Sequence, residues 1–544
     1  MAAQGRNRTA RFHQPLLLAG LLLAAVFLGR GWIAAAAEPL PLHGAVAAWA
    51  EQNPGEPVPL IVQHTGQPDG LLQFVRASGG TVEREFHIIP AVDVAIPATT
   101  VDDLARRTDV NWISLDAPVQ SAHLPGDGEK LPDPRKLRNA FPAAITATKV
   151  WSQYAGAGVT VAVVDTGISD DNHPDFAHGA TARVKAELVA TTNSTSDQDG
   201  YGHGTHVAGI IGGDGSLVSD ARYAGVAPLV NLVDVKVGDD AGNATISDVM
   251  AGLEWVDDNR TAYNIRVINL SLTSSVAQSY EVDPLDAAVE LLWFHEVAVV
   301  VSAGNLGTAA DAVYYPPAND PFVIVVGAVD DGGTAGQPDD TVTSWSSRGI
   351  TQDGFAKPDV VAPGRDLVSD IDPTSVLARE HPDHLVSSSY FRMSGTSMSA
   401  AVASGVVALI REAHPDWLPG QVKYALRDTA RPLAGDASAR EPLTDKAIAY
   451  TGTPPSADDG IKPNNMLLAA AGVSDSDLNG IRWRDATFGG IRWAGLELNG
   501  IRWGTIDWSG IRWGSVSFDG IRWGGATFDG IRWGGIRWGS FIED

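Results

Sequence analysis

The chain has 544 residues, which exceeds the usual size of one hydrophobic core, so two to four domains are expected. Its net charge of -26 argues against a nucleic-acid binder, because binding to phosphates needs a basic face. It contains no cysteine, which excludes disulfides, so core packing or bound ions must stabilise the fold.

The first 37 residues, 1–37, are expected to be a signal peptide. Three arginines among the first eleven residues precede an apolar stretch at 16–28, and four alanines end at Ala37. A basic start, a short apolar run and a small-residue end are typical of an export signal. We therefore expect a protein that is secreted or associated with the cell surface, with an uncleaved membrane anchor as the alternative.

Residues 38–118 have the pattern of a small α+β domain. Stretches typical of strands and helices follow the order βαββαβ, at 58–62, 70–75, 85–89, 92–96, 100–105 and 110–115. This order predicts a ferredoxin-like fold, with Thr100 as the cap of the second helix. The next stretch, 119–140, is rich in turn-forming and charged residues and is expected to be a linker.

A second domain is expected at 141–473. The apolar run 159–164 is typical of a strand buried on both faces of a parallel sheet, and Asp165-Thr166-Gly167 follows at its carboxyl end. This edge is where α/β sheets bind ligands. The same tripeptide marks aspartic proteases, but these need a second copy, which the sequence lacks.

His203 and His206 lie three residues apart at the start of an expected helix. They could be ligands of a metallohydrolase, although zinc sites need further ligands at recognisable spacing. We favour different roles, with His203 as a base at the site and His206 packed in the helix. Asp197 and Asp199 predict no calcium loop, because the glutamate that closes an EF-hand is absent.

Ser397 stands directly before a run of small and apolar residues, 402–410, that predicts a buried helix. Unpaired N–H groups and the positive end of the dipole at a helix N-terminus would stabilise an oxyanion beside the hydroxyl. An ordinary N-cap serine is the alternative. Only partners elsewhere in the chain can decide between the two.

Three motifs together resemble the subtilisin-like serine proteases, the subtilases of peptidase family S8. They are Val-Asp-Thr-Gly at 164–167, Gly-His-Gly-Thr-His-Val-Ala-Gly at 202–209 and Gly-Thr-Ser-Met at 395–398. The resemblance covers about 141–472. It implies a three-layer α/β domain with a mostly parallel sheet and a catalytic triad of Asp165, His203 and Ser397. It also implies that 38–118 is an inhibitory propeptide.

The resemblance implies the remaining site residues as well. Asn305, in an Ala-Gly-Asn turn, would supply the side-chain amide of the oxyanion hole. Substrates would pair with an extended strand, and the residues expected to contact them are Ser271, Leu272, Thr273, Gly238 and Tyr314. Thr273 stands where the family usually has glycine. No cofactor is required and no metal ligand is predicted. A structural calcium ion stays open as an alternative, although there is no clear motif for it.

The composition changes to a repeat at 474–544. Gly-Ile-Arg-Trp recurs seven times, and large apolar residues recur every five positions. Such repetition predicts a β-solenoid or stacked short hairpins. Its arginines suggest that the tail binds an anionic cell-surface or polysaccharide ligand, and a rigid spacer is the alternative.

The sequence thus predicts a secreted serine endopeptidase that acts through an acyl-enzyme and cuts itself in the linker. Its partners would be protein or peptide substrates and its own propeptide, with no nucleic acid. A catalytically silent surface-binding protein that uses its tail is the alternative from another class.

Overall fold

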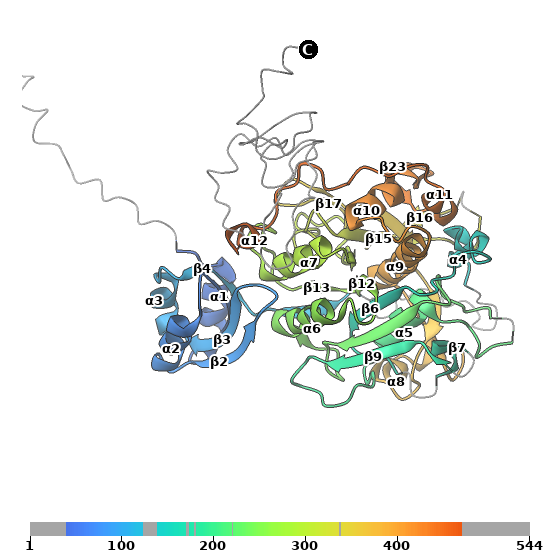
Figure 1. Cartoon of the computed structure of the whole chain (residues 1–544). Helices are drawn as coiled ribbons and strands as arrows, with labels where there is room; N and C mark the ends of the chain where they lie inside the picture. The colour runs from blue at the N-terminus through green and yellow to red at the C-terminus, as the bar shows by residue number, and fades with distance from the viewer. Residues whose placement is uncertain are drawn as a thin grey trace, which may run out of the picture. The chain divides into compact units, whose positions relative to one another are not determined.

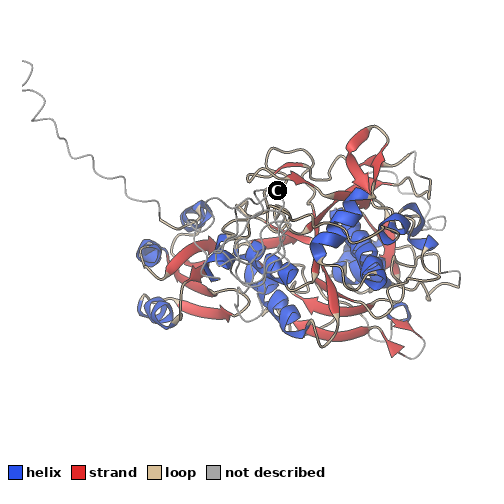
Figure 2. Cartoon of the chain, turned by 45° about the horizontal axis from the view of Figure 1, so that its top comes forward, coloured by secondary structure: helices blue, strands red, loops and turns tan. Residues whose placement is uncertain are grey.

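The computed structural model describes residues 40–122, 139–169, 173–178, 181–219, 221–336 and 339–470 (Figure 1). The expected signal peptide and repeat tail lie outside these residues, as does most of the linker. The described residues form both helices and strands (Figure 2). None of the helices within those ranges is long and apolar enough to cross a bilayer.

The N-terminal domain is an antiparallel sheet with the strand order β2-β3-β1-β4. Its elements are α1 (Gly44–Gln52), β1 (Pro57–His64), α2 (Asp69–Ala77), β2 (Thr81–Phe86), β3 (Ala91–Pro97), α3 (Val101–Ala105) and β4 (Val110–Leu115). Apart from the extra helix α1, they follow the predicted βαββαβ order. Thr100 is the N-cap residue of α3, as predicted, but its hydroxyl donates to the carbonyl of Pro97 at 2.8 Å and makes no cap bond to the helix.

The second domain is organised around a sheet with the order β16-β15-β14-β12-β6-β10-β9, with β19 also paired to β15. Every pair is parallel except β15 with β16. The strands are β6 (Thr160–Asp165), β9 (Val184–Val189), β10 (Asn231–Lys236), β12 (Ile265–Leu270), β14 (Ala298–Ser302), β15 (Ile324–Asp330), β16 (Thr341–Val342) and β19 (Val360–Pro363). The prediction of a mostly parallel sheet is therefore confirmed.

Helices cover both faces of this sheet, and every residue of β6 and β14 is therefore buried. Two pairs of helices pack on it, α5 (His203–Gly212) with α9 (Thr396–Ala413), and α6 (Ile246–Asn259) with α7 (Pro284–Phe294). Full burial of each Val or Leu side chain stabilises the fold by roughly 1.5–3 kcal/mol. The result is the predicted three-layer α/β domain.

Small residues let α9 lie deep in this core. A Cβ at Gly405 would come within 2.5 Å of the Cβ of Val226, so no larger residue fits there without a shift of the backbone. The residues from Thr396 to Arg411 are all buried. Ser397, in the first turn, therefore has a position set by the packing of the whole helix.

Part of the expected linker forms a strand. β5 (Pro118–Ser121) lies between β11 (Ala244–Thr245) and β13 (Leu272–Ser274) and pairs antiparallel with both. The prediction of an unstructured linker from residue 119 was wrong at this point. The reason is tertiary, since both partner strands belong to the second domain.

The other elements surround the second domain. They are α4 (Phe141–Ala144), β7 (Ala177–His178), β8 (Thr181–Ala182), β17 (Gly349–Ile350), β18 (Ala356–Lys357), β20 (Leu367–Asp370), α8 (Val376–Glu380), β21 (Tyr390–Met393), α10 (Pro419–Asp428), β22 (Arg431–Leu433), β23 (Asp436–Glu441), α11 (Thr444–Ile448) and α12 (Asn465–Ala470).

Candidate active site

Asp165 and His203 meet at the carboxyl edge of the parallel sheet. Asp165 is the last residue of β6, and His203 is the first residue of α5. Nδ1 of His203 lies 2.7 Å from Oδ1 of Asp165, and both side chains are buried. A carboxylate can only accept, so Nδ1 carries the proton and Nε2 is the nitrogen that can take one from a hydroxyl.

Ser397 lies in the first turn of α9 and is fully buried. Its hydroxyl donates to the carbonyl of Ser271 at 3.1 Å, and its backbone N–H donates to the carbonyl of Ala122 at 3.2 Å. The hydroxyl of Ser271 in turn donates to the carbonyl of Ser397 at 3.0 Å. The N–H at a helix N-terminus thus binds a peptide carbonyl, as an oxyanion hole requires.

Asn305 is tied to the residue before Ser397. Its amide oxygen accepts from the backbone N–H of Thr396 at 3.1 Å and from the Thr396 hydroxyl at 3.0 Å. The same hydroxyl accepts from the N–H of Gly304 at 3.1 Å. These bonds fix the amide with its oxygen toward α9, so its NH₂ group is the end left to donate to another oxygen.

Residues 118–122 lie as an extended peptide between β11 and β13, with Ala122 at Ser397. The space that they fill is called the groove below. Leu272 pairs with Ser121, Thr273 with Gln120, and Ser274 with Val119. The N–H of Ala122 donates to the carbonyl of Ser271 at 3.2 Å. The sequence-predicted residues Ser271, Leu272 and Thr273 thus lie along this peptide. Gly238 lines a small pocket beside it, together with Val119, Ser121 and Leu272.

A larger cavity of about 280 Å³ lies beside Ala122. It is lined by Gln120, Ser121, Ala122, Thr273, Ser274, Ser275, Ala303, Gly304, Asn305, Leu306, Ala312 and Tyr315. Tyr314, the residue chosen from sequence, is not part of this lining, and its neighbour Tyr315 takes that place. The two tyrosines are consecutive, and the sequence contains no signal for which of them lines the cavity.

His206 does not join the site. It is fully buried, and its Nε2 lies 3.0 Å from the carbonyl of Phe391. Burial lowers the pKa of its imidazole to about 3, so the ring stays neutral. In the part of the chain that the structure describes, no three His, Cys, Asp or Glu side chains are grouped to hold a metal ion.

Sequence reasoning missed Asp199 as a functional candidate. Its carboxylate is fully buried and accepts hydrogen bonds from residues that flank both Asp165 and His203. The signal in the sequence was an aspartate four positions before His203 in a glycine-rich stretch, but its partners could not be identified from the chain alone.

Comparisons with known proteins give the family. The Subtilase family model matches residues 156–451, and the model of a putative peptidase inhibitor domain matches 35–116. The serine protease AprX of Bacillus subtilis (strain 168) is 39% identical over 278 residues, which are 50% of this chain and 61% of that protein. Subtilisin E of the same organism is 31% identical over 362 residues, 65% of this chain and 79% of its own.

Among solved structures, fervidolysin from Fervidobacterium pennivorans, a keratinolytic enzyme related to subtilisin, superposes with a TM-score of 0.56. It is 24% identical and the match covers 74% of this chain and 62% of that one, which supports the fold. With the family model matching more than half of the sequence, the chain belongs to the subtilase family of serine endopeptidases.

Proposed function

We propose that the chain is an exported serine endopeptidase, made as a precursor whose N-terminal domain inhibits it until the chain cuts itself. The observation that carries this is the position of β5, which pairs with strands on both sides and brings the carbonyl of Ala122 to the N–H of Ser397. A substrate would lie in the same place by strand addition. The start of the chain at 1–37, which has the sequence pattern of a signal peptide, supports export.

The reaction follows from the donors and acceptors already described. Nε2 of His203 takes the proton of Ser397 as its Oγ bonds to the substrate carbonyl carbon, and the Ser397 N–H and the Asn305 NH₂ group stabilise the oxyanion. His203 then gives the proton to the leaving nitrogen, and the C–N bond breaks to leave an ester on Ser397. Water attacks this acyl-enzyme by the same route and restores the serine.

The first prediction concerns Ser397. The wild-type exported protein should lose the N-terminal domain and cleave casein, whereas Ser397→Ala should keep the domain and be inert, because the variant lacks the hydroxyl that forms the ester. Intact mass and a casein assay on both proteins check this. Equal masses with no cleavage by either would favour the silent surface-binding alternative. Cleavage that a chelator abolishes and a serine-directed phosphonate spares would favour the metallohydrolase.

The bond that is cut is proposed to be the one between Ala122 and His123. The carbonyl of Ala122 is the one bound by Ser397 N–H, and the amide that follows it is the leaving group. We expect the released fragment to end at Ala122, as intact mass at early times will report. Gln120→Ala, which keeps the backbone pairing of β5, should leave the cut unchanged. A fragment with any other C-terminus would contradict the assignment.

The cavity beside Ala122 predicts the preferred substrates. Alanine leaves a space of about 280 Å³, so an apolar side chain larger than alanine before the cut bond should bury more surface there. In a peptide series that differs only at this residue, we expect leucine or phenylalanine to raise kcat/KM over alanine by about tenfold, since each 1.4 kcal/mol is tenfold. An equal or lower value for both would contradict it.

The contact between the N-terminal domain and α6 contains acids that are buried or half-buried. Asp116 accepts from the N–H and the hydroxyl of Ser247, each at 2.9 Å, and the Arg84 guanidinium donates to the Ser247 carbonyl at 3.2 Å. Burial, with the charge of neighbouring Asp116, raises the pKa of Asp93 to about 7. Burial raises the pKa of Asp116 to about 6, and it also raises the pKa of Asp248.

These groups predict that the cut N-terminal domain is released as pH rises. A raised carboxyl pKa means that the complex is most stable below the ordinary pKa of an aspartate and loses stability as pH rises through 6 to 7. In that range Asp93 and Asp116 become charged and repel each other, and Glu83 repels Asp93 as well. Arg84 is the neighbouring cation that partly offsets this repulsion. We expect the affinity of the cut N-terminal domain for the second domain to fall roughly tenfold or more between pH 5 and pH 8. Size-exclusion chromatography of the cut complex measures it.

The control separates this effect from general charge. Asp93→Asn should flatten the pH dependence, because the amide resembles the protonated acid, whereas exposed Glu56→Gln should not. Release that is independent of pH in the wild type would contradict the proposal.

The tail at 474–544 is proposed to bind an anionic surface or polysaccharide. The arginines that recur there, in an otherwise acidic chain, support this proposal.

A further inference from the structure

The site depends on two loops that are far apart in sequence, the loop that follows β6 and the loop that precedes α5. Asp165 ends β6 and His203 begins α5, 38 residues later, yet their side chains approach to 2.7 Å. A hydrogen bond of this length holds only if both backbones are fixed relative to each other. Asp199 lies in the loop before α5, and only 1% of its surface is exposed.

The carboxylate of Asp199 connects these loops through four donors. Its Oδ1 accepts from the hydroxyl of Thr166 at 2.8 Å and from the N–H of Gly202 at 2.7 Å. Its Oδ2 accepts from the N–H and the hydroxyl of Thr205, each at 2.8 Å. Thr166 directly follows Asp165, and Gly202 directly precedes His203.

Thr166 closes the connection from the other side. Its hydroxyl, while donating to Asp199, accepts from the N–H of Gly204 at 2.9 Å. The hydroxyl of Thr205 accepts from the N–H of Ser169, in the loop after Asp165, at 3.0 Å. His203 is therefore flanked on both sides by backbone N–H groups that are bound to one carboxylate and one hydroxyl.

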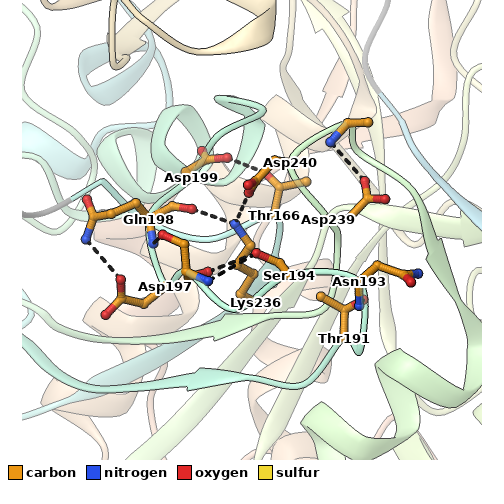
Figure 3. Close-up of polar contacts among 12 residues, drawn as sticks. Thr166, Thr191, Asn193, Ser194, Asp197, Gln198, Asp199, Lys236, Asp239 and Asp240 are labelled. Carbon is orange, nitrogen blue, oxygen red and sulfur yellow. Dashed lines mark hydrogen bonds and ion pairs between the residues drawn. The ribbon is translucent and has the colours of Figure 1, made fainter.

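A buried lysine, Lys236, binds the residue that precedes Asp199 (Figure 3). Nζ of Lys236 donates to the carbonyl of Gln198 at 2.5 Å and to Asp240 at 2.6 Å. Lys236 pairs with Asp165 in the register of β10 with β6. It thus ties the residue before Asp199 to the strand next to the one that carries the catalytic aspartate.

All four contacts to Asp199 come from donors, so an anion is the form that satisfies them. An asparagine of the same shape would place an NH₂ group against at least one of these donors. We propose that Asp199 and Thr166 are positioning residues that hold His203 against Asp165 for proton transfer. This rests on the proposed function, since it assigns a role in the same reaction.

The test compares isosteric variants with a matched control. Asp199→Asn and Thr166→Val remove a charge or a hydroxyl, whereas Thr166→Ser keeps the hydroxyl. With active molecules counted by a serine-directed phosphonate, we expect the first two to lower kcat about 10- to 100-fold with KM unchanged, and the serine variant to keep kcat within about twofold.

Two readouts separate positioning from a structural role. If the bond to Asp165 loosens, the imidazolium of His203 loses its anion, so the acid limb of kcat/KM should move to lower pH in both damaged variants. In a Ser397→Ala background, which does not cut itself, the strongly deshielded NMR signal of the Nδ1 proton should be lost on adding Asp199→Asn and kept on adding Thr166→Ser.

The outcomes are distinct. An Asp199→Asn protein that melts at lower temperature but keeps kcat, the pH profile and the Nδ1 proton signal would overturn the proposal. A wild type that cleaves no peptide would refute the proposed function, while the NMR comparison would still report whether Asp199 positions His203.

Discussion

The short hydrogen bond between His203 and Asp165 is the interaction on which the site depends. It joins two groups that lie out of water, where an unpaired charge is costly and a paired one needs good geometry. The parallel sheet provides half of that geometry, because β6 ends at Asp165 in register with Lys236 of β10. The start of α5 provides the other half, fixed by the contacts of Asp199.

Packing takes the place of disulfides in holding this arrangement. The chain has no cysteine, and α9 lies in the core with small residues where a larger side chain would collide, as at Gly405. Because the helix is rigid over its buried length, Ser397 and Thr396 in its first turn are held in place. Thr396 then orients Asn305, so both of the donors proposed to bind the oxyanion depend on one helix.

The parallel sheet could be predicted from the sequence because its signals are local. The triad is proposed on signals of the same kind, since Asp165, His203 and Ser397 each lie in a short motif next to a strongly patterned strand or helix. The strand at 118–121 could not be predicted, since its stability comes from partners more than 100 residues away. The place of Tyr315 in the cavity lining and the contacts of Asp199 could not be predicted for the same reason, because tertiary packing decides which side chains meet.

The position of β5 creates a tension within the precursor. The main-chain bonds that present Ala122 to Ser397 are the same before and after a cut, so hydrolysis alone does not remove the fragment from the groove. In the arrangement described, the Ser397 hydroxyl donates to Ser271, so it must rotate before His203 can take its proton. Both features delay the appearance of a free site. Departure of the fragment then depends on its contact with α6, where Asp93 is buried and Asp116 is half-buried beside Ser247. The carboxyls outside the groove, and not the triad, would thus set when the groove opens.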